Sequence, residues 1–270
     1  MSRFKQFATK YPLAFGIVIA LTFMVLTVAA YALAFPLSAL FPSDAHGQQM
    51  SEAITRMALA LLCILVLWRF GWLRAAGFAR LPGWKVWLLF LLPVVYDVGT
   101  VIYAYTGDFR ITFPGPALAA SVLFNQLTVG LVEETVFRGI VMYAMLRRWG
   151  NTKRGIIKSV LLSALIFGAL HVLNLATGKP VLPTILQSLG AALGGIVYSV
   201  FVLYGKSIWP AVLWHALVNA AVNVKVIGDP TYVETPSMGV LYVLLGLPVV
   251  IYGLILLRKV PLQPVVPEAD

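Results

Sequence analysis

Two adjacent glutamates and an arginine lie in the middle of an apolar part of the chain. Glu133, Glu134 and Arg138 all fall within the segment Val132–Gly139. A charged residue at the centre of a membrane helix costs about 2.5–3.5 kcal/mol on insertion scales, so these charges do not serve the stability of their own helix. Glu134 and Arg138 are four residues apart, and we expect an ion pair on one helix face. Glu133 points about 100° away from this face and has no partner in its own helix.

Two histidines and an asparagine occupy two other apolar stretches. His171 follows Phe167 by four residues, and Asn219 follows His215 by four, so the members of each pair lie on one helix face. Glu133 and His171 each lie about 20 Å along their helices from the basic loop that joins them, at about 1.5 Å per residue. We therefore expect these two residues to meet at one depth in the membrane.

A carboxylate, two imidazoles and an amide inside a membrane suit the attack of water on a carbonyl group. Glu133 can act as the general base that takes a proton from water, while His171 holds that water in place. His215 and Asn219 can donate hydrogen bonds to the oxyanion that develops on the carbonyl. The adjacent ion pair would orient the helix. These residue types predict hydrolysis of a peptide bond.

Membrane helices must position these side chains. Of the 270 residues, 60% are hydrophobic and 11% charged, with a mean hydropathy of +0.91, whereas soluble domains carry about 25% charged residues. A membrane helix needs about 20 apolar residues, and eight such stretches fill the chain as one all-α membrane domain over residues 1–270. The predicted stretches are Pro12–Phe35, Ala53–Phe70, Trp84–Thr106, Pro116–Leu146, Ile157–Leu175, Leu182–Leu203, Ile208–Val224 and Met238–Leu257.

The formal net charge of +10 indicates orientation rather than nucleic-acid binding, because the basic residues lie in short loops on one side of the predicted helices. This side carries Arg3, Lys5, Lys10, Arg69, Arg74, Arg80, Lys85, Arg147, Arg148, Lys153, Arg154, Lys158, Lys206, Arg258 and Lys259. The opposite side carries Arg56, Arg110, Lys179 and Lys225. Both termini are therefore predicted to be cytoplasmic, in the plasma (inner) membrane of a prokaryote.

Two smaller features complete the expected bundle. Gly190, Gly194 and Gly195 lie within one predicted stretch and indicate close packing against a neighbouring helix. Asp97 lies toward the outer half of its stretch, where we expect it to be solvated.

Three motifs resemble those of the CPBP family, the CaaX proteases and bacteriocin-processing enzymes, also called Abi proteins or type II CaaX prenyl endopeptidases. The motifs are Glu-Glu-x-x-x-Arg at residues 133–138, Phe-x-x-x-His at 167–171 and His-x-x-x-Asn at 215–219. They occur in the family's order on three separate predicted helices. The resemblance covers about residues 115–225, which we interpret as the catalytic core.

The resemblance implies an eight-helix intramembrane endopeptidase, a glutamate peptidase whose cavity opens toward the membrane and the cytosol. It implies catalytic roles for four residues and supporting roles for two: Glu133, His171, His215 and Asn219, then Glu134 and Arg138. The substrate would be a protein or peptide embedded in the lipid bilayer. Whether that substrate is prenylated or otherwise lipid-anchored stays open.

A metal-dependent mechanism is the alternative chemistry. Glu133, His171 and His215 match the number of protein ligands in a catalytic zinc site. The chain lacks the His-Glu-x-x-His pattern of zinc proteases, and its single cysteine, Cys63, excludes a cysteine-based metal cluster. We therefore favour water activated by the glutamate without a cofactor.

Two other function classes remain open. The intramembrane acids and histidines would also fit the ion or proton path of a coupled transporter or a channel. A non-catalytic membrane scaffold or immunity protein is the third class, and it would tolerate replacement of the motif residues.

Overall fold

The computed structural model describes residues 3–106, 115–228 and 235–262, and all regular structure in these ranges is helical. The elements are α1 Arg3–Lys10, α2 Pro12–Ser38, α3 Ala45–Arg69, α4 Trp84–Thr106, α5 Pro116–Glu134, the π-helix η1 Thr135–Met142, α6 Tyr143–Trp149, α7 Lys153–Leu170, the 3₁₀ helix η2 His171–Thr177, α8 Val181–Gly205, α9 Trp209–Gly228 and α10 Pro236–Leu257.

Each of the eight predicted apolar stretches is helical in the structure. The fourth stretch is one continuous rod, because α5 passes directly into η1 and η1 into α6. The second stretch begins earlier than predicted, at Ala45 instead of Ala53. Asp44 explains the earlier start, because its side chain accepts a hydrogen bond of 2.9 Å from the Gly47 N–H and caps the first turn of α3.

Six helices in the described ranges are long and apolar enough to cross a membrane, which supports an integral membrane protein. Their spans are Pro12–Ala30, Ala45–Arg69, Trp84–Tyr103, Lys153–Ala176, Val181–Gly205 and Pro236–Leu257. The rod that carries Glu133 and the helix that carries His215 are not in this set. That all eight stretches cross the membrane stays a prediction.

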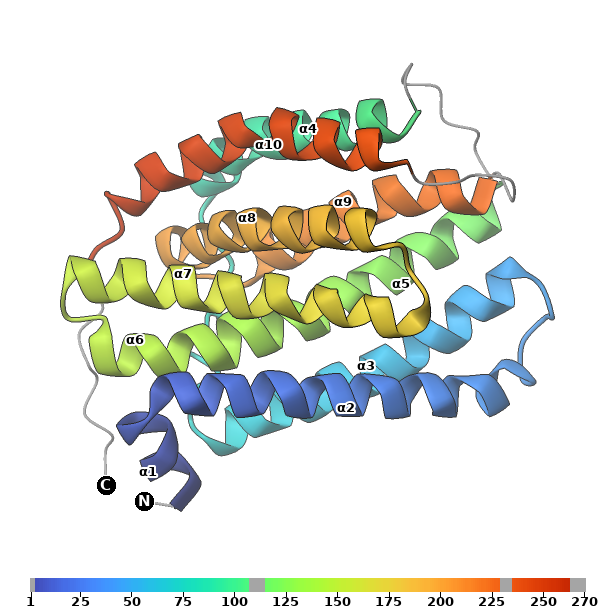
Figure 1. Ribbon diagram of the computed structural model, residues 1–270. Helices are drawn as coiled ribbons and strands as arrows, with labels where there is room; N and C mark the ends of the chain where they lie inside the picture. The colour runs from blue at the N-terminus through green and yellow to red at the C-terminus, as the bar shows by residue number, and fades with distance from the viewer. Residues whose placement is uncertain (1–2, 107–114, 229–234, 263–270) are drawn as a thin grey trace.

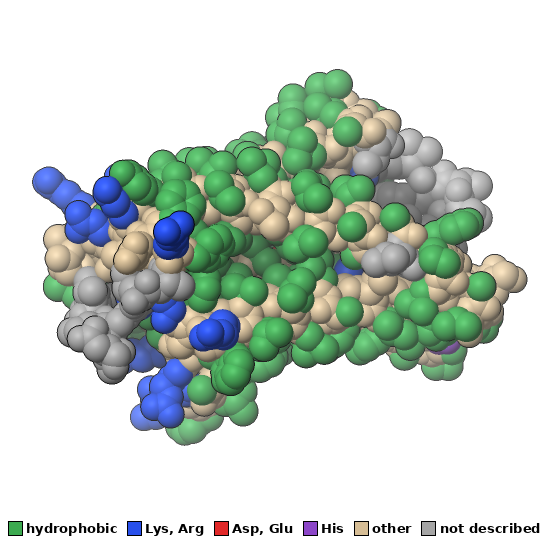
Figure 2. Space-filling view, turned by 90° about the horizontal axis from the view of Figure 1, so that it is seen from below, with side chains coloured by type: hydrophobic (Ala, Val, Ile, Leu, Met, Phe, Trp, Pro, Cys, Tyr) green, Lys and Arg blue, Asp and Glu red, His purple; other side chains and the backbone are tan. Residues whose placement is uncertain are grey.

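Basic side chains gather at one end of the bundle (Figure 2). The beginning of α7 and the residues after α10 meet there, because the Lys153 ammonium donates hydrogen bonds to the carbonyls of Arg258 and Val260. In Figure 1, α1 and the last turn of α10 lie at this same end. The fold thus groups the basic loops as the sequence pattern predicts, and their cytoplasmic side stays a prediction.

Two hydrophobic cores lie side by side in the bundle. Figure 1 shows α2 and α3 along one side, α4 and α10 along the opposite side, and α5, α7, α8 and α9 between them. One core packs around α2, α3 and η1, with Phe15 and Phe137 fully buried. The other packs around α4, α8, α9 and α10, with Phe201 and Trp214 fully buried. The polar motif residues lie where the two cores meet.

Two glycines allow the central helices to approach closely. A Cβ atom on Gly130 of α5 would lie 2.7 Å from the Val212 carbonyl oxygen of α9. A Cβ atom on Gly195 of α8 would lie 3.2 Å from the Ala164 Cα of α7 and 3.0 Å from Nη2 of Arg138. The close packing predicted for Gly195 is therefore present, and it also leaves room for the arginine.

Candidate active site

The predicted ion pair between Glu134 and Arg138 is present and fully buried. Nη1 of Arg138 lies 2.9 Å from Oε1 of Glu134, and both side chains are 0% exposed. A buried pair costs much desolvation, and breaking one by removing a partner typically destabilises a protein by about 3–5 kcal/mol. This pair therefore depends on its surroundings to hold it in place.

Arg138 lies within the π-helix η1, a feature that the sequence did not predict. The wider turn of a π-helix disturbs the regular backbone bonding, and such turns occur frequently at functional sites. The Ser163 hydroxyl of α7 donates a 2.8 Å hydrogen bond to the Phe137 carbonyl of η1. The Thr135 hydroxyl donates to the Leu131 carbonyl at 2.6 Å. The two hydroxyl groups thus donate hydrogen bonds to backbone carbonyls at and just before the π-helix.

Two aromatic rings enclose the guanidinium group of Arg138. Its Cζ atom lies 4.6 Å from the ring centroid of Phe167 and 5.4 Å from that of Tyr198. Nε and Nη2 of Arg138 are buried without a hydrogen-bond partner in the described part of the chain. The faces of the two rings stabilise the cation instead, by cation–π interaction.

His215 of α9 bridges the two adjacent glutamates. Its Nδ1 lies 2.9 Å from Oε1 of Glu134, and its Nε2 lies 3.6 Å from Oε2 of Glu133. Because the Glu134 oxygen already accepts from Arg138, it acts as an acceptor here too, and Nδ1 of His215 carries the proton. The 3.6 Å separation is too long for a hydrogen bond, so Nε2 and the Glu133 carboxylate can both contact a third group.

The ring of His215 is held between the same two aromatic residues as Arg138. Tyr198 stacks on it with ring centroids 5.2 Å apart and planes 16° apart. Phe167 meets it edge-on at 5.8 Å. Helices α7 and α8 therefore supply the walls that orient the arginine of η1 and the histidine of α9.

His171 begins η2, directly after the last residue of α7. Its Nδ1 lies 3.0 Å from the Phe167 carbonyl oxygen. A carbonyl only accepts, so Nδ1 donates and Nε2 is directed elsewhere. The ring also meets the Phe167 ring edge-on at 5.0 Å, which places His171 and His215 against the same aromatic ring. Among the residues that the structure describes, it forms no hydrogen bond with Glu133.

Asn219 lies one turn beyond His215 on α9 and is half-buried. Its backbone carbonyl accepts a 2.8 Å hydrogen bond from the Asn223 amide. Its own side-chain amide is bonded to no other residue in the described ranges, so the structure does not tie it to the bridged glutamates. The predicted oxyanion role of Asn219 stays a prediction.

The structure does not join the predicted zinc ligands into one site. Within residues 3–106, 115–228 and 235–262, no three His, Cys, Asp or Glu side chains converge closely enough to hold a metal ion. Glu133 and His215 are neighbours, whereas His171 is directed along its own helix by the Phe167 carbonyl. The zinc alternative stays a prediction.

The expectation that Asp97 is solvated is wrong. Its side chain on α4 is buried, at 7% exposed, and its Oδ2 accepts a 2.8 Å hydrogen bond from Nε1–H of Trp214 on α9. Trp214 packs edge-on against Tyr198 at 5.9 Å. Hydropathy reports depth along a helix but not which face α9 covers, so the sequence carried no signal for this contact.

Tyr198 and Phe167 are the residues at this site whose importance the sequence did not show. Phe167 occurs in a motif, but its ring also contacts Arg138, His171 and His215. Tyr198 lies outside all three motifs. An aromatic residue in an apolar helix is too common to single out, so only its position over His215 identifies it.

Comparison with protein families matches residues 115–221 to the family described as Type II CAAX prenyl endopeptidase Rce1-like. No curated protein and no solved structure matches the chain. The matched segment begins at α5 and ends within α9, so it contains all three motifs and the residues that enclose them. It confirms the predicted resemblance to CaaX proteases, because the segment that builds this site is similar to the Rce1-like type II CAAX prenyl endopeptidases.

Proposed function

We propose that the chain is an intramembrane endopeptidase in which Glu133 activates a water molecule to hydrolyse a peptide bond. The observation that carries the proposal is the bridge made by His215, which bonds to the buried Glu134 and approaches Glu133. The bridge gives one carboxylate a fixed structural partner and leaves the other available for chemistry. The family match supports the reaction class.

Glu133 has the position of a general base. Its side chain is 22% exposed, in contrast to the fully buried Glu134. In the proposed reaction the Glu133 carboxylate takes a proton from water, and the water oxygen bonds to the carbonyl carbon of the substrate. When the carbon–nitrogen bond then breaks, the same carboxyl returns that proton to the leaving amine.

The two histidines would have different partners in this reaction, the water for His171 and the oxyanion for His215. His171 donates through Nδ1 to a backbone carbonyl, which leaves Nε2 to accept a hydrogen bond from the water. His215 uses Nδ1 on Glu134, so it stabilises an oxyanion through Nε2 only when both ring nitrogens are protonated. Asn219 would supply the second donor to the oxyanion.

The substrate would be a membrane-embedded protein or peptide that reaches the site within the lipid bilayer. Prenylated and other lipid-anchored proteins are the two classes to test. If a zinc ion participates instead, Glu133, His171 and His215 would be its ligands, and it would lower the pKa of its bound water. Dialysis of the active protein against a chelator separates the two chemistries, because only the zinc form loses activity and recovers it when zinc is restored.

The decisive experiment measures cleavage of membrane-tethered peptides by the purified protein. Glu133→Gln removes the base but keeps the shape of the side chain, so we expect hydrolysis to fall by about 10²–10⁴-fold. His171→Ala should lose activity as well, whereas His46→Ala, at the beginning of α3, serves as its matched control. Size-exclusion chromatography must show that all variants remain monodisperse. Undiminished cleavage by Glu133→Gln would overturn the mechanism.

A further inference from the structure

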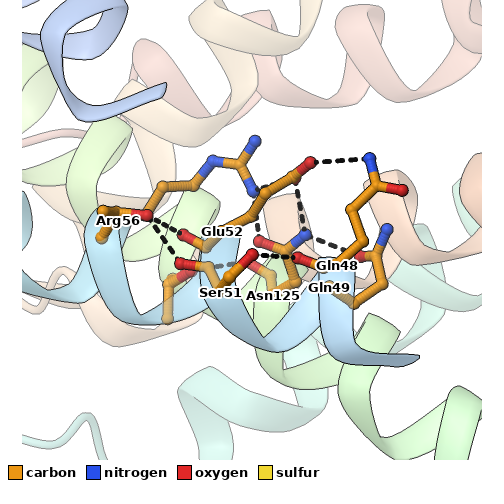
Figure 3. Close-up of polar contacts among 8 residues, drawn as sticks. Gln48, Gln49, Ser51, Glu52, Arg56 and Asn125 are labelled. Carbon is orange, nitrogen blue, oxygen red and sulfur yellow. Dashed lines mark hydrogen bonds and ion pairs between the residues drawn. The ribbon is translucent and has the colours of Figure 1, made fainter. Parts of the chain in front are cut away.

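A second group of polar side chains connects α3 to α5 (Figure 3). We call Gln49, Glu52, Arg56 and Asn125 the α3–α5 cluster. Oε2 of Glu52 accepts hydrogen bonds from Arg56 at 2.9 Å and from the Asn125 amide at 3.2 Å. Asn125 also donates to Gln49 at 2.6 Å and accepts from Arg56. The cluster belongs to none of the three motifs.

A cavity connects this cluster with Glu133. It has a volume of about 90 Å³ and lies between α2, α3 and α5. Apolar side chains form about half of its lining, and Glu52, Thr55, Arg56 and Glu133 are among its polar residues. Asn125, the member of the cluster on α5, lies about 12 Å before Glu133 along that helix, at about 1.5 Å per residue. The cavity therefore spans the distance between the polar cluster and the proposed general base.

The size and lining of the cavity indicate water. Charged side chains within a membrane protein almost always face the bundle interior or a water-filled cavity, and Glu52 and Arg56 are 19% and 14% exposed. One water molecule needs about 10–15 Å³ and two to four polar partners, so several fit here. Pockets for larger ligands usually measure about 300–1,000 Å³, so the volume of this cavity suits water better than a larger ligand.

We propose that this cavity is the water entrance of the hydrolytic site. Water enters beside the α3–α5 cluster and passes between α2, α3 and α5 to Glu133. The proposal rests on the proposed function, since it assigns the water to the Glu133 carboxylate. Because α3 ends at Arg69 among the basic loops, Glu52 lies toward the opposite end. Under the predicted orientation, water therefore enters from the non-cytoplasmic side, opposite to the opening toward the membrane and the cytosol that the family resemblance implies.

Thiol labelling tests whether the cavity holds water. In a Cys63→Ala background, Thr55→Cys places a thiol in the cavity, and Ile54→Cys places one on the outer face of the same turn of α3, where Ile54 is 39% exposed. A charged, membrane-impermeant thiol reagent needs water to reach its target. We expect Thr55→Cys to react many-fold faster than Ile54→Cys, and only when the reagent is added on the non-cytoplasmic side.

Filling the cavity tests whether this water is used. Val129→Phe enlarges a side chain of α5 that lines the cavity, and Leu127→Phe makes a matched change on the lipid-facing side, where Leu127 is 40% exposed. We expect Val129→Phe to lower kcat several-fold with KM unchanged, because it restricts water rather than substrate. Leu127→Phe should retain the kcat of the unmodified protein.

Three outcomes would contradict the proposal that this cavity admits water to Glu133. Equal labelling of Thr55→Cys and Ile54→Cys would show a dry cavity, and an unchanged kcat in Val129→Phe would show water that is not used. Protection of Thr55→Cys by a bound peptide substrate would identify a substrate subsite instead. Retained hydrolysis in Glu133→Gln would overturn the proposed function, and rapid labelling of Thr55→Cys would then report a wet cavity without a catalytic role.

Discussion

The chain contains two ion pairs of the same type in two different surroundings. Glu134–Arg138 and Glu52–Arg56 have the same spacing, the same order and the same 2.9 Å separation between Nη1 and the carboxylate. In each pair the glutamate also accepts a hydrogen bond from another helix, from His215 in the first and from Asn125 in the second. The local sequence pattern does not distinguish them.

Their surroundings distinguish them. The first pair is 0% exposed, and its arginine lies in a π-helix between two aromatic rings. The second pair is partly exposed and borders a cavity. A buried pair holds its geometry because losing either partner leaves an uncompensated charge. A partly hydrated pair contributes little and tolerates change. The same Glu-x-x-x-Arg spacing thus contacts His215 in one region and lines a cavity in the other.

The largest expected difference is in folding stability. Arg138→Ala leaves Glu134 buried without its cation and should lower the free energy of unfolding by about 3–5 kcal/mol. The Arg56–Glu52 pair itself contributes about 1 kcal/mol or less, but Arg56→Ala also removes the donor to the buried Asn125 oxygen, so we expect a smaller loss of about 1–3 kcal/mol. Denaturation of both variants in detergent micelles measures the difference. Equal losses would show that the two pairs are equally buried in the membrane-embedded protein.

The two regions each contain an asparagine, Asn219 near the buried pair and Asn125 in the α3–α5 cluster, and we expect different effects from their loss. The side-chain amide of Asn219 has no hydrogen-bond partner among the described residues. We therefore expect Asn219→Ala to lower kcat by about 10²–10³-fold, as removal of one oxyanion donor does, with little change in thermal stability. Asn125 is buried and fully bonded, so Asn125→Ala should lower stability by about 1–3 kcal/mol. Peptide hydrolysis and thermal unfolding, measured on both variants, would contradict this division if Asn219→Ala lost stability but kept kcat.

Glu134→Gln tests whether the buried pair positions His215. The amide keeps the shape of the side chain but gives Nδ1–H of His215 a neutral acceptor in place of a charged one. It also removes the anion that compensates the buried Arg138, so hydrolysis is compared at equal amounts of folded protein. We expect kcat to fall by about 10²-fold with KM unchanged, by analogy with carboxylates that orient catalytic histidines. The pH dependence of kcat should shift as well, which loss of structure alone would not produce. A raised KM at unchanged kcat would instead assign Glu134 to substrate binding.

The smallest expected effect concerns the aromatic wall, which only the buried pair has. Tyr198→Leu removes the ring that stacks on His215 and faces Arg138, and should destabilise the protein by about 1–2 kcal/mol. Tyr198→Phe keeps the ring and is the matched control, with a stability close to that of the unmodified protein. Thermal unfolding of the two variants measures this difference in stability. Equal losses of stability would assign the role to the hydroxyl group.

The helices were predictable to the extent that they are apolar. The prediction for α4 matches its observed bounds, Trp84–Thr106. An uninterrupted apolar segment in a membrane forms a helix, because its backbone groups must bond to one another. The beginning of α3 was missed because its first turns are polar and face Asn125 of another helix. Asp97 was misjudged for the same reason, since its partner Trp214 lies on α9.

The sequence predicted which residues carry the motifs, but it predicted only some of the contacts between them. The i,i+4 rule predicted the ion pair of Glu134 and Arg138, because both partners lie in one helix. The contact of His215 with both glutamates depends on how closely α9 approaches α5 at Gly130. The π-helix depends on a hydroxyl from α7. Neither contact leaves a periodic signal in the chain.

The sequence by itself determined that this protein is a helical membrane protein with costly polar residues at three places. The bilayer imposes this result, because backbone groups in hydrocarbon must bond within their own helix and each buried charge needs a reason to be there. Only the tertiary structure decided how deeply each charged pair is buried. Two Glu–Arg pairs of equal spacing differ in that respect because burial, and hence the local dielectric, is a property of the packed helices rather than of the chain.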